Sequence, residues 1–289
     1  PDVCANIIKE KSADVIINAA AYNLVEKAET EIALANIING ESPSRMAEAA
    51  ALKNIPFIHI STDYVFNGNG QEAWKPGDES EPLNAYGRSK LYGEEGVCAA
   101  GGPYVILRTS WVFSAYGQNF AKTMLYLSKT HNTLRIVDDQ IGGPTAAPDI
   151  ATACLIIAKD LYSGREVSGT YHFSGSPDVS WADFAREIFA QTGRKTTVEN
   201  ISTSDFPSAA KRPLNSRLNC ITLNSFFGIE RPNWRASLKN VLKDLQEQGL
   251  FTRDVDPLAS TEFTYTRFLV PYLSNYEDYA IFCDSDFLW

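Results

Sequence analysis

Short apolar runs alternate with helix-like stretches along the first 160 residues, and this alternation is the strongest constraint on the fold. Strands separated by helical stretches of about 10–15 residues are typical of βαβ units, in which the strands run parallel. We expect strands at residues 14–21, 56–61, 103–109 and 133–137, and helices at residues 3–11, 44–54, 85–99, 119–129 and 149–161. The sequence therefore predicts an α/β fold with a parallel sheet.

After about residue 140 the predicted elements become shorter and turns more frequent. Ser180 and Asp183 predict a capped helix that continues to Thr192, and residues 233–249 predict a closing helix. Parallel sheets bind ligands at the carboxyl ends of their strands, so a smaller lobe is expected to cover that edge. We expect a sheet domain over residues 1–140, a substrate-binding lobe over residues 141–250, and a linker and tail over residues 251–289.

Composition excludes several classes of function. The net charge of −9 disfavours binding to the phosphate backbone of nucleic acids. No apolar run approaches the roughly 20 residues of a membrane-spanning helix, so no membrane partner is expected. The five cysteines are scattered without a C-x-x-C pair, which is typical of reduced thiols and favours a cytoplasmic location.

The residues that carry chemistry lie between Ser61 and Lys90. Thr62 and Asp63 follow a predicted strand at its carboxyl end, and Tyr86 and Lys90 are four residues apart on one face of the next predicted helix. A phenol has a pKa near 10, and a nearby ammonium group lowers that value by favouring the phenolate. Tyr86 is therefore the candidate general acid/base, with Thr62 placed to hold a substrate oxygen against it.

Eight longer motifs carry a more specific signal. In chain order they are NAAAY (18–22), VEKAE (25–29), STDYVF (61–66), PLNAYGRSK (82–90), RTSWVF (108–113), NFAKTM (119–124), DQIGGPT (139–145) and RPLNSRL (212–218). Together they resemble the dTDP-4-dehydrorhamnose reductases, a family of extended short-chain dehydrogenases/reductases. The resemblance runs from about residue 2 to residue 249.

This resemblance implies a reaction and a role for individual residues. NADPH or NADH would deliver a hydride to the C4 ketone of a nucleotide sugar, dTDP-4-dehydro-L-rhamnose, while Tyr86 protonates the ketone oxygen. Lys90 would lower the pKa of Tyr86 and hold the nicotinamide ribose, and Thr62 would tune the tyrosine. The cofactor cleft would be lined by Ala19, Ala20, Ala21, Ile60, Tyr86 and Lys90. The nucleotide sugar would be contacted by Thr62, Asp63, Trp111, Asn119 and Arg212, with Arg212 suited to phosphate.

One family feature is missing. The family begins with a strand and a G-x-x-G-x-x-G turn that receives the cofactor pyrophosphate, and residues 67–71 (NGNGQ) offer only a plain turn. We therefore expect an incomplete Rossmann-type sheet with helices on both faces, and weak NADPH binding by this chain alone. Two alternatives stay open: a non-catalytic, reductase-like binding or regulatory module, and a truncated fusion product. The sequence also leaves the oligomeric state open, and a homodimer is one of the alternatives.

The remaining polar and aromatic candidates have ordinary interpretations. Residues 280–286 resemble the Asp-x-Asp segment of GT-A glycosyltransferases, so Asp284 and Asp286 are candidate metal ligands, with an unrelated acidic loop as the alternative. No other metal site is predicted. His59 and His172 fall inside predicted strands and are expected to be sheet or core residues. Trp181 and Phe184 follow helical spacing and are expected in the core.

Overall fold

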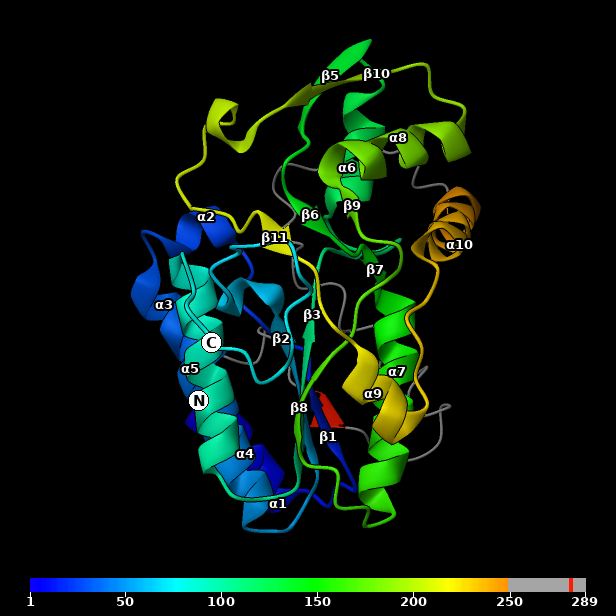
Figure 1. Ribbon diagram of the computed structural model, residues 1–289. Helices are drawn as coiled ribbons and strands as arrows, with labels where there is room; N and C mark the ends of the chain where they lie inside the picture. Colours follow the sequence, from blue (N-terminus) through cyan, green and yellow to red (C-terminus); the bar gives the residue numbers. More distant parts are fainter. Residues whose placement is uncertain (249–280, 283–289) are drawn as a thin grey trace.

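A parallel sheet lies at the centre of the computed structural model, which describes residues 1–248 and 281–282 (Figure 1). Its strands in the described residues are ordered β12, β1, β2, β3 and β8, and every neighbouring pair is parallel. Their bounds are β1 (Ile16–Asn18), β2 (Phe57–Thr62), β3 (Tyr104–Thr109), β8 (Gly169–His172) and β12 (Ile281–Phe282). The predicted α/β class with a parallel sheet is confirmed.

Helices cover both faces of this sheet. On one face α1 (Asp2–Glu10), α4 (Ser42–Ala51) and α5 (Ala85–Ala99) share an apolar cluster with the strands, and on the other face α7 (Ala147–Tyr162) and α9 (Ile221–Phe227) do the same. Apolar packing on both faces explains why the strands are almost continuous apolar runs in the sequence. The segment between β1 and α4 forms α2 (Val25–Ala28), α3 (Ile32–Asn36) and a π-helical turn, η1 (Ile37–Glu41).

Local signals set most helix ends. Asn84 caps α5, its side-chain oxygen accepting from the backbone of Gly87, and Ser180 caps α8 (Trp181–Thr192) as predicted. The start of α4 has no side-chain cap, because the π-helical turn runs directly into the helix. The Ser42 hydroxyl instead donates to the carbonyl of Ile37 at 2.8 Å.

A second group of elements lies beyond the carboxyl ends of the strands (Figure 1). Here α6 (Phe120–Leu127), α8 and α10 (Trp234–Glu247) pack around a separate apolar cluster that includes Phe184 and Trp234. The predicted strand at 133–137 forms β5 (Thr133–Val137) but pairs with β10 (Thr197–Ile201) outside the main sheet. Shorter pairings join β4 (Val112–Phe113) with β7 (Thr145–Ala146), and β11 (Asn215–Ser216) with β6 (Ile141–Gly142) and β9 (Val179–Ser180).

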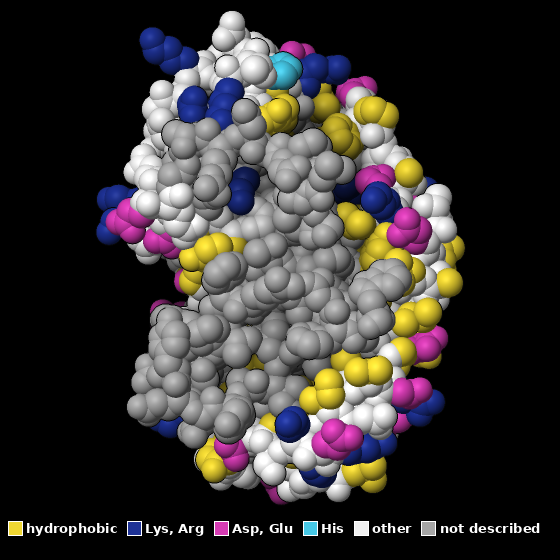
Figure 2. Space-filling model, turned by 180° about the vertical axis from the view of Figure 1, so that it is seen from behind, with side chains coloured by type: hydrophobic (Ala, Val, Ile, Leu, Met, Phe, Trp, Pro, Cys, Tyr) yellow, Lys and Arg dark blue, Asp and Glu magenta, His cyan; other side chains and the backbone are white. Residues whose placement is uncertain are grey.

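The predictions about membrane helices and metal sites can be compared with the structure only for the described residues. Within the described residues, no helix has the length and apolarity needed to cross a membrane. The same residues contain no cluster of three potential metal ligands, and the candidates Asp284 and Asp286 lie outside the described residues. Figure 2 shows Lys and Arg side chains as well as Asp and Glu side chains spread over the described part of one face.

Candidate active site

A cavity of about 410 Å³ lies at the carboxyl ends of β2 and β3, between the sheet and the second group of elements. Its lining includes every predicted cofactor or substrate residue except Ala20, namely Ala19, Ala21, Ile60, Thr62, Asp63, Tyr86, Lys90, Trp111, Asn119 and Arg212. The backbone amide of Ala20 instead donates to the side-chain oxygen of Asn18 at 3.2 Å. Residues up to 193 positions apart in the sequence therefore meet in one cavity, as the strand-end argument predicts.

Tyr86, Thr62 and Asp63 form the polar centre of this cavity. The Thr62 hydroxyl donates to Asp63 Oδ1 at 3.1 Å and is also hydrogen-bonded to the Tyr86 phenol. Burial raises the pKa of Tyr86 above its ordinary value, against the opposing effect of the Thr62 hydrogen bond. Burial likewise raises the pKa of Asp63 to about 6, although hydrogen bonds from Ser216 and Thr62 oppose it. A protonated phenol is thus favoured near neutral pH.

Lys90 forms part of the wall beside this centre and is 1% exposed. Its Nζ donates to the carbonyl of Ile60 at 2.7 Å and lies 3.2 Å from Nε2 of His59. Burial lowers the pKa of Lys90 to about 8, with Glu94 acting in the opposite direction. The expected decrease in the pKa of Tyr86 is not seen in this structure, because burial outweighs other influences on the phenol.

Two stacked indole rings form the wall nearest the second group of elements. The rings of Trp111 and Trp181 lie 3.7 Å apart between centroids with an interplanar angle of 11°. Trp111 has a φ of 51°, and a Cβ at Gly142 would lie 2.8 Å from its ring, so the glycine permits this close contact. Trp181 lines the cavity as well as packing on the core, so sequence analysis missed a site residue. Helical spacing alone gave no signal for that second role.

Arg212 reaches the cavity from the far end of the sequence. It pairs with Glu26 of α2 at 2.8 Å and is hydrogen-bonded to the Tyr64 hydroxyl, while its buried Nε has no partner among the described residues. Glu26 also accepts from Ser208 and from the backbone of Ala210. The VEKAE segment is therefore not simply a solvated helix face, because its Glu26 joins the loop of residues 208–212 to the cavity rim.

The other polar groups of the cavity differ in whether they have a hydrogen-bond partner among the described residues. Asn119 caps α6 by accepting from the backbone of Lys122 and donates to the carbonyl of Ser114. In contrast, the buried hydroxyls of Ser61 and Thr109 line the same cavity without a hydrogen-bond partner in the part of the chain that the structure describes. Unsatisfied buried hydroxyls are costly unless a ligand engages them, so these two residues indicate a polar ligand.

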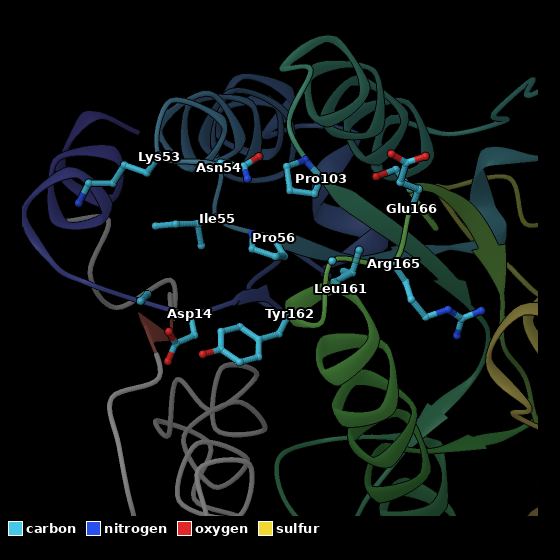
Figure 3. A pocket seen from close by; sticks show the side chains of 13 residues that line it. Asp14, Lys53, Asn54, Ile55, Pro56, Pro103, Leu161, Tyr162, Arg165 and Glu166 are labelled. Atoms are coloured by element: carbon cyan, nitrogen blue, oxygen red, sulfur yellow. The ribbon is translucent and has the colours of Figure 1, made fainter.

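A second cavity lies at the amino ends of the same strands (Figure 3). Its lining includes residues that immediately precede strands, such as Pro56, Pro103 and Ser168. Lys53 there donates to the carbonyls of Ile8 and Lys11, and Arg165 pairs with Asp160. Both of these cations therefore already have partners among the described residues.

The fold and the site together define a class. A parallel sheet, a strand ending in a hydroxyl residue, and a helix that presents a tyrosine and a lysine four residues later are the features of short-chain dehydrogenases/reductases. Within that class, the family model described as RmlD substrate binding domain matches residues 1–247. The chain belongs to the dTDP-4-dehydrorhamnose reductase family.

Relatives and solved structures agree with this assignment. The chain is 43% identical to a dTDP-4-dehydrorhamnose reductase of Sinorhizobium fredii over 85% of each sequence, and 36% identical to that of Escherichia coli K12 over 85% of this chain and 84% of the relative. The Clostridium acetobutylicum reductase structure superposes with a TM-score of 0.79, at 40% identity, covering 84% of this chain and 85% of that chain. The Bacillus anthracis enzyme, solved in complex with NADP, gives 0.77 at 35% identity, with 83% and 84% covered. These findings support the reductase hypothesis over the non-catalytic binding module.

Proposed function

We propose that this chain reduces the C4 ketone of dTDP-4-dehydro-L-rhamnose to the alcohol of dTDP-L-rhamnose, with NADPH as the hydride donor. The observation that carries the proposal is the buried Tyr86–Thr62 pair in the cavity, in a chain of this reductase family. Two relatives with this activity in their names are at least 36% identical.

The cavity suits a reduced nicotinamide cofactor. Ala19 and Ala21 leave room for close approach, and Ile60 supplies an apolar surface beside Lys90. The unpartnered hydroxyls of Ser61 and Thr109 offer hydrogen bonds to a polar group. When bound, the cofactor supplies the hydride, and the related enzyme solved with NADP makes the phosphorylated cofactor our choice over NADH.

The protein's own residues supply the proton and the positioning. Tyr86 donates its phenolic proton to the ketone oxygen as that oxygen gains negative charge, and the protein recovers the proton from solvent. The raised pKa of Tyr86 keeps the phenol protonated at neutral pH, which suits reduction. Thr62 holds the oxygen in line with the phenol, and a charged Lys90 stabilises the phenolate that remains.

The nucleotide sugar is proposed to occupy the rest of the cavity. Asp63 contacts the sugar together with Thr62, and Trp111 flanks its ring. Arg212 and Asn119 face the diphosphate, and the unpartnered Nε of Arg212 supports this placement because a guanidinium suits phosphate geometry.

The proposal extends to the domain organisation, the oligomeric state and the cellular location of the chain. We assign cofactor binding to residues 1–140 and substrate binding to the lobe of residues 141–250. A homodimer and a cytoplasmic location are also proposed, and the four described cysteines, which are all free thiols, support a reducing compartment.

Loss of NADPH absorbance in the presence of dTDP-4-dehydro-L-rhamnose tests this function directly. Wild-type chain is expected to consume NADPH only when the sugar nucleotide is present, and Tyr86→Phe is expected to lose on the order of 10²–10⁴-fold in kcat. Tyr92→Phe, on the exposed side of the same helix, is the matched control and keeps full activity. Unchanged turnover in Tyr86→Phe would overturn the assignment.

A further inference from the structure

A buried chain of hydrogen bonds leads from β1 to the candidate catalytic lysine. The backbone amide of Ala20 donates to Asn18 Oδ1 at 3.2 Å, and Asn18 Nδ2 lies 3.0 Å from His59 Nδ1. The other imidazole nitrogen, Nε2, lies 3.2 Å from Lys90 Nζ, which also donates to the Ile60 carbonyl at 2.7 Å. Asn18, His59 and Lys90 are at most 2% exposed, so solvent does not replace these partners.

The direction of each hydrogen bond follows from its first member. A backbone amide can only donate, so the side-chain oxygen of Asn18 faces Ala20 and its NH₂ group faces His59. His59 Nδ1 must then accept, and the proton of the neutral imidazole must lie on Nε2. Nε2–H points at Lys90 Nζ, where it is paired only if that nitrogen has a lone pair. An amine satisfies this contact, whereas an ammonium group sets donor against donor.

We propose that His59 is a positioning residue for the reduction: its Nε2–H tautomer, fixed by Asn18, faces the Lys90 amine beside β2 and makes it a weaker base, so that the charged form that stabilises the Tyr86 phenolate is lost just above neutral pH. This inference rests on the proposed function of Lys90 and deepens it. Lys90 would then exchange its proton close to neutral pH, instead of remaining a permanent cation in the cavity wall. His59 acts through Lys90 and does not itself contact the reacting atoms.

The charged groups around Lys90 are consistent with this role. Burial lowers the pKa of Lys90 to about 8 and lowers that of His59 well below its ordinary value, with Lys90 contributing to the second effect. Glu94, one turn further along α5, acts in the opposite direction on Lys90, but its carboxylate is held by Arg108 of β3 at 2.6 Å. Tyr86 on α5 and Asp63 at the end of β2 act on each other across the cavity. Glu94 is thus occupied by its ion pair with Arg108. The side chain in hydrogen-bond contact with Lys90 is the neutral imidazole of His59.

Nitrogen NMR of the imidazole rings tests the tautomer without any need for turnover. The chain contains three histidines, so a spectrum of the full chain labelled with ¹⁵N-histidine is assigned by comparison with His59→Gln. We expect the Nε2–H tautomer of His59 from pH 5 to 9, with one inflection near pH 8 that disappears in Lys90→Met. The Nδ1–H tautomer, or an inflection that persists in Lys90→Met, would overturn the proposal even if the chain proved inactive.

The pH profile of kcat/KM supplies the functional readout. In His59→Gln the new amide oxygen can accept from an ammonium group, so the basic limb is expected to move up by about one pH unit. His172→Gln is the matched control, because His172 is equally buried on β8 but contacts the Trp74 carbonyl. A basic limb that is unchanged in His59→Gln, or that moves equally in His172→Gln, would contradict the role of His59. Absence of turnover in the wild-type chain would instead count against the proposed function.

Discussion

Two cations are buried beside the same sheet, and their surroundings differ. Arg108 on β3 makes a bidentate contact with Glu94, at 3.0 and 2.6 Å, and also donates to the Pro76 carbonyl and the Ser80 hydroxyl. Lys90 on α5 has a carbonyl and an imidazole as its recorded hydrogen-bond partners and lines the cavity. Arg108 is thus neutralised within the protein, whereas the charge of Lys90 depends on proton exchange or on a ligand.

We expect this difference to separate a structural cation, Arg108, from a catalytic one, Lys90. A buried ion pair with complete hydrogen bonding contributes little more to stability than an apolar pair of similar volume. Removing one partner is nevertheless strongly destabilising, because the other charge is left buried without compensation. A buried cation without a carboxylate partner has a lowered pKa and a persistent energetic cost. Such a cost is expected at a site of chemistry, because function and not stability retains the group. Substitution at each cation therefore tests whether the two roles differ.

The largest expected effect is on catalysis at Lys90. Lys90→Met keeps the length and apolar stem of the side chain and removes the amine, so kcat is expected to fall by on the order of 10²–10⁴-fold. Removing a buried group that prefers its charged form in water is expected to leave the free energy of unfolding equal or higher. Steady-state kinetics and urea unfolding on the same preparation measure both quantities. A variant that is active but unstable would place Lys90 with Arg108 as a structural cation.

Arg108 is expected to show the opposite pattern. Arg108→Met leaves the Glu94 carboxylate buried without its partner, so the free energy of unfolding should fall by about 3–5 kcal/mol. Activity per folded molecule is expected to change little, because Arg108 lies outside the catalytic cavity. The double variant Arg108→Met with Glu94→Gln removes both charges and should recover part of the stability. If the single variant is as stable as wild type, the ion pair does not have the role assigned to it.

The sequence predicted the residues that local pattern determines, and missed those that depend on long-range pairing. Tyr86 and Lys90 lie on α5, whose bounds match the predicted helix at 85–99, and the cavity lies at the predicted strand ends. The contact of His59 with Lys90 was not predicted, because a histidine within an apolar strand has the same pattern whether it packs or hydrogen-bonds. The direction of its ring depends on Asn18, which is 41 residues away.

The long-range contacts of Trp181 and of the acidic VEKAE segment were not predicted, for a similar reason. Trp181 follows helical spacing, but its ring lines the cavity and stacks on that of Trp111, which lies against Gly142. Glu29 accepts from the first backbone amide of α5 at 2.7 Å, across 56 residues. Periodicity records which face of an element is buried, but it does not record which distant group a polar side chain meets.

A third cation extends the comparison to a partly exposed pair with a smaller expected effect. Arg212 pairs with Glu26, whose side chain is 42% exposed. Burial alone raises the pKa of Glu26, but hydrogen bonds from Arg212, Ser208 and Ala210 outweigh it and lower the pKa to about 2. Because the folded value lies below the ordinary value of 4.5, the contribution to stability is present above pH 4.5 and is lost as the pH falls towards 2.

Glu26→Gln removes that acid-sensitive contribution. Solvent screening limits the loss of stability at pH 7 to less than about 1 kcal/mol, and the decrease in stability between pH 4.5 and pH 2 should become shallower than in wild type. Thermal unfolding of both proteins across this range makes the measurement, with Glu48→Gln as a control on the exposed pair with Arg45. Equal pH dependence in wild type and Glu26→Gln would show that the pair adds nothing in the folded chain. Among the described residues, the Tyr64 hydroxyl would then be the partner that holds Arg212 at the cavity rim, and Arg212 would resemble Lys90 more closely than Arg108.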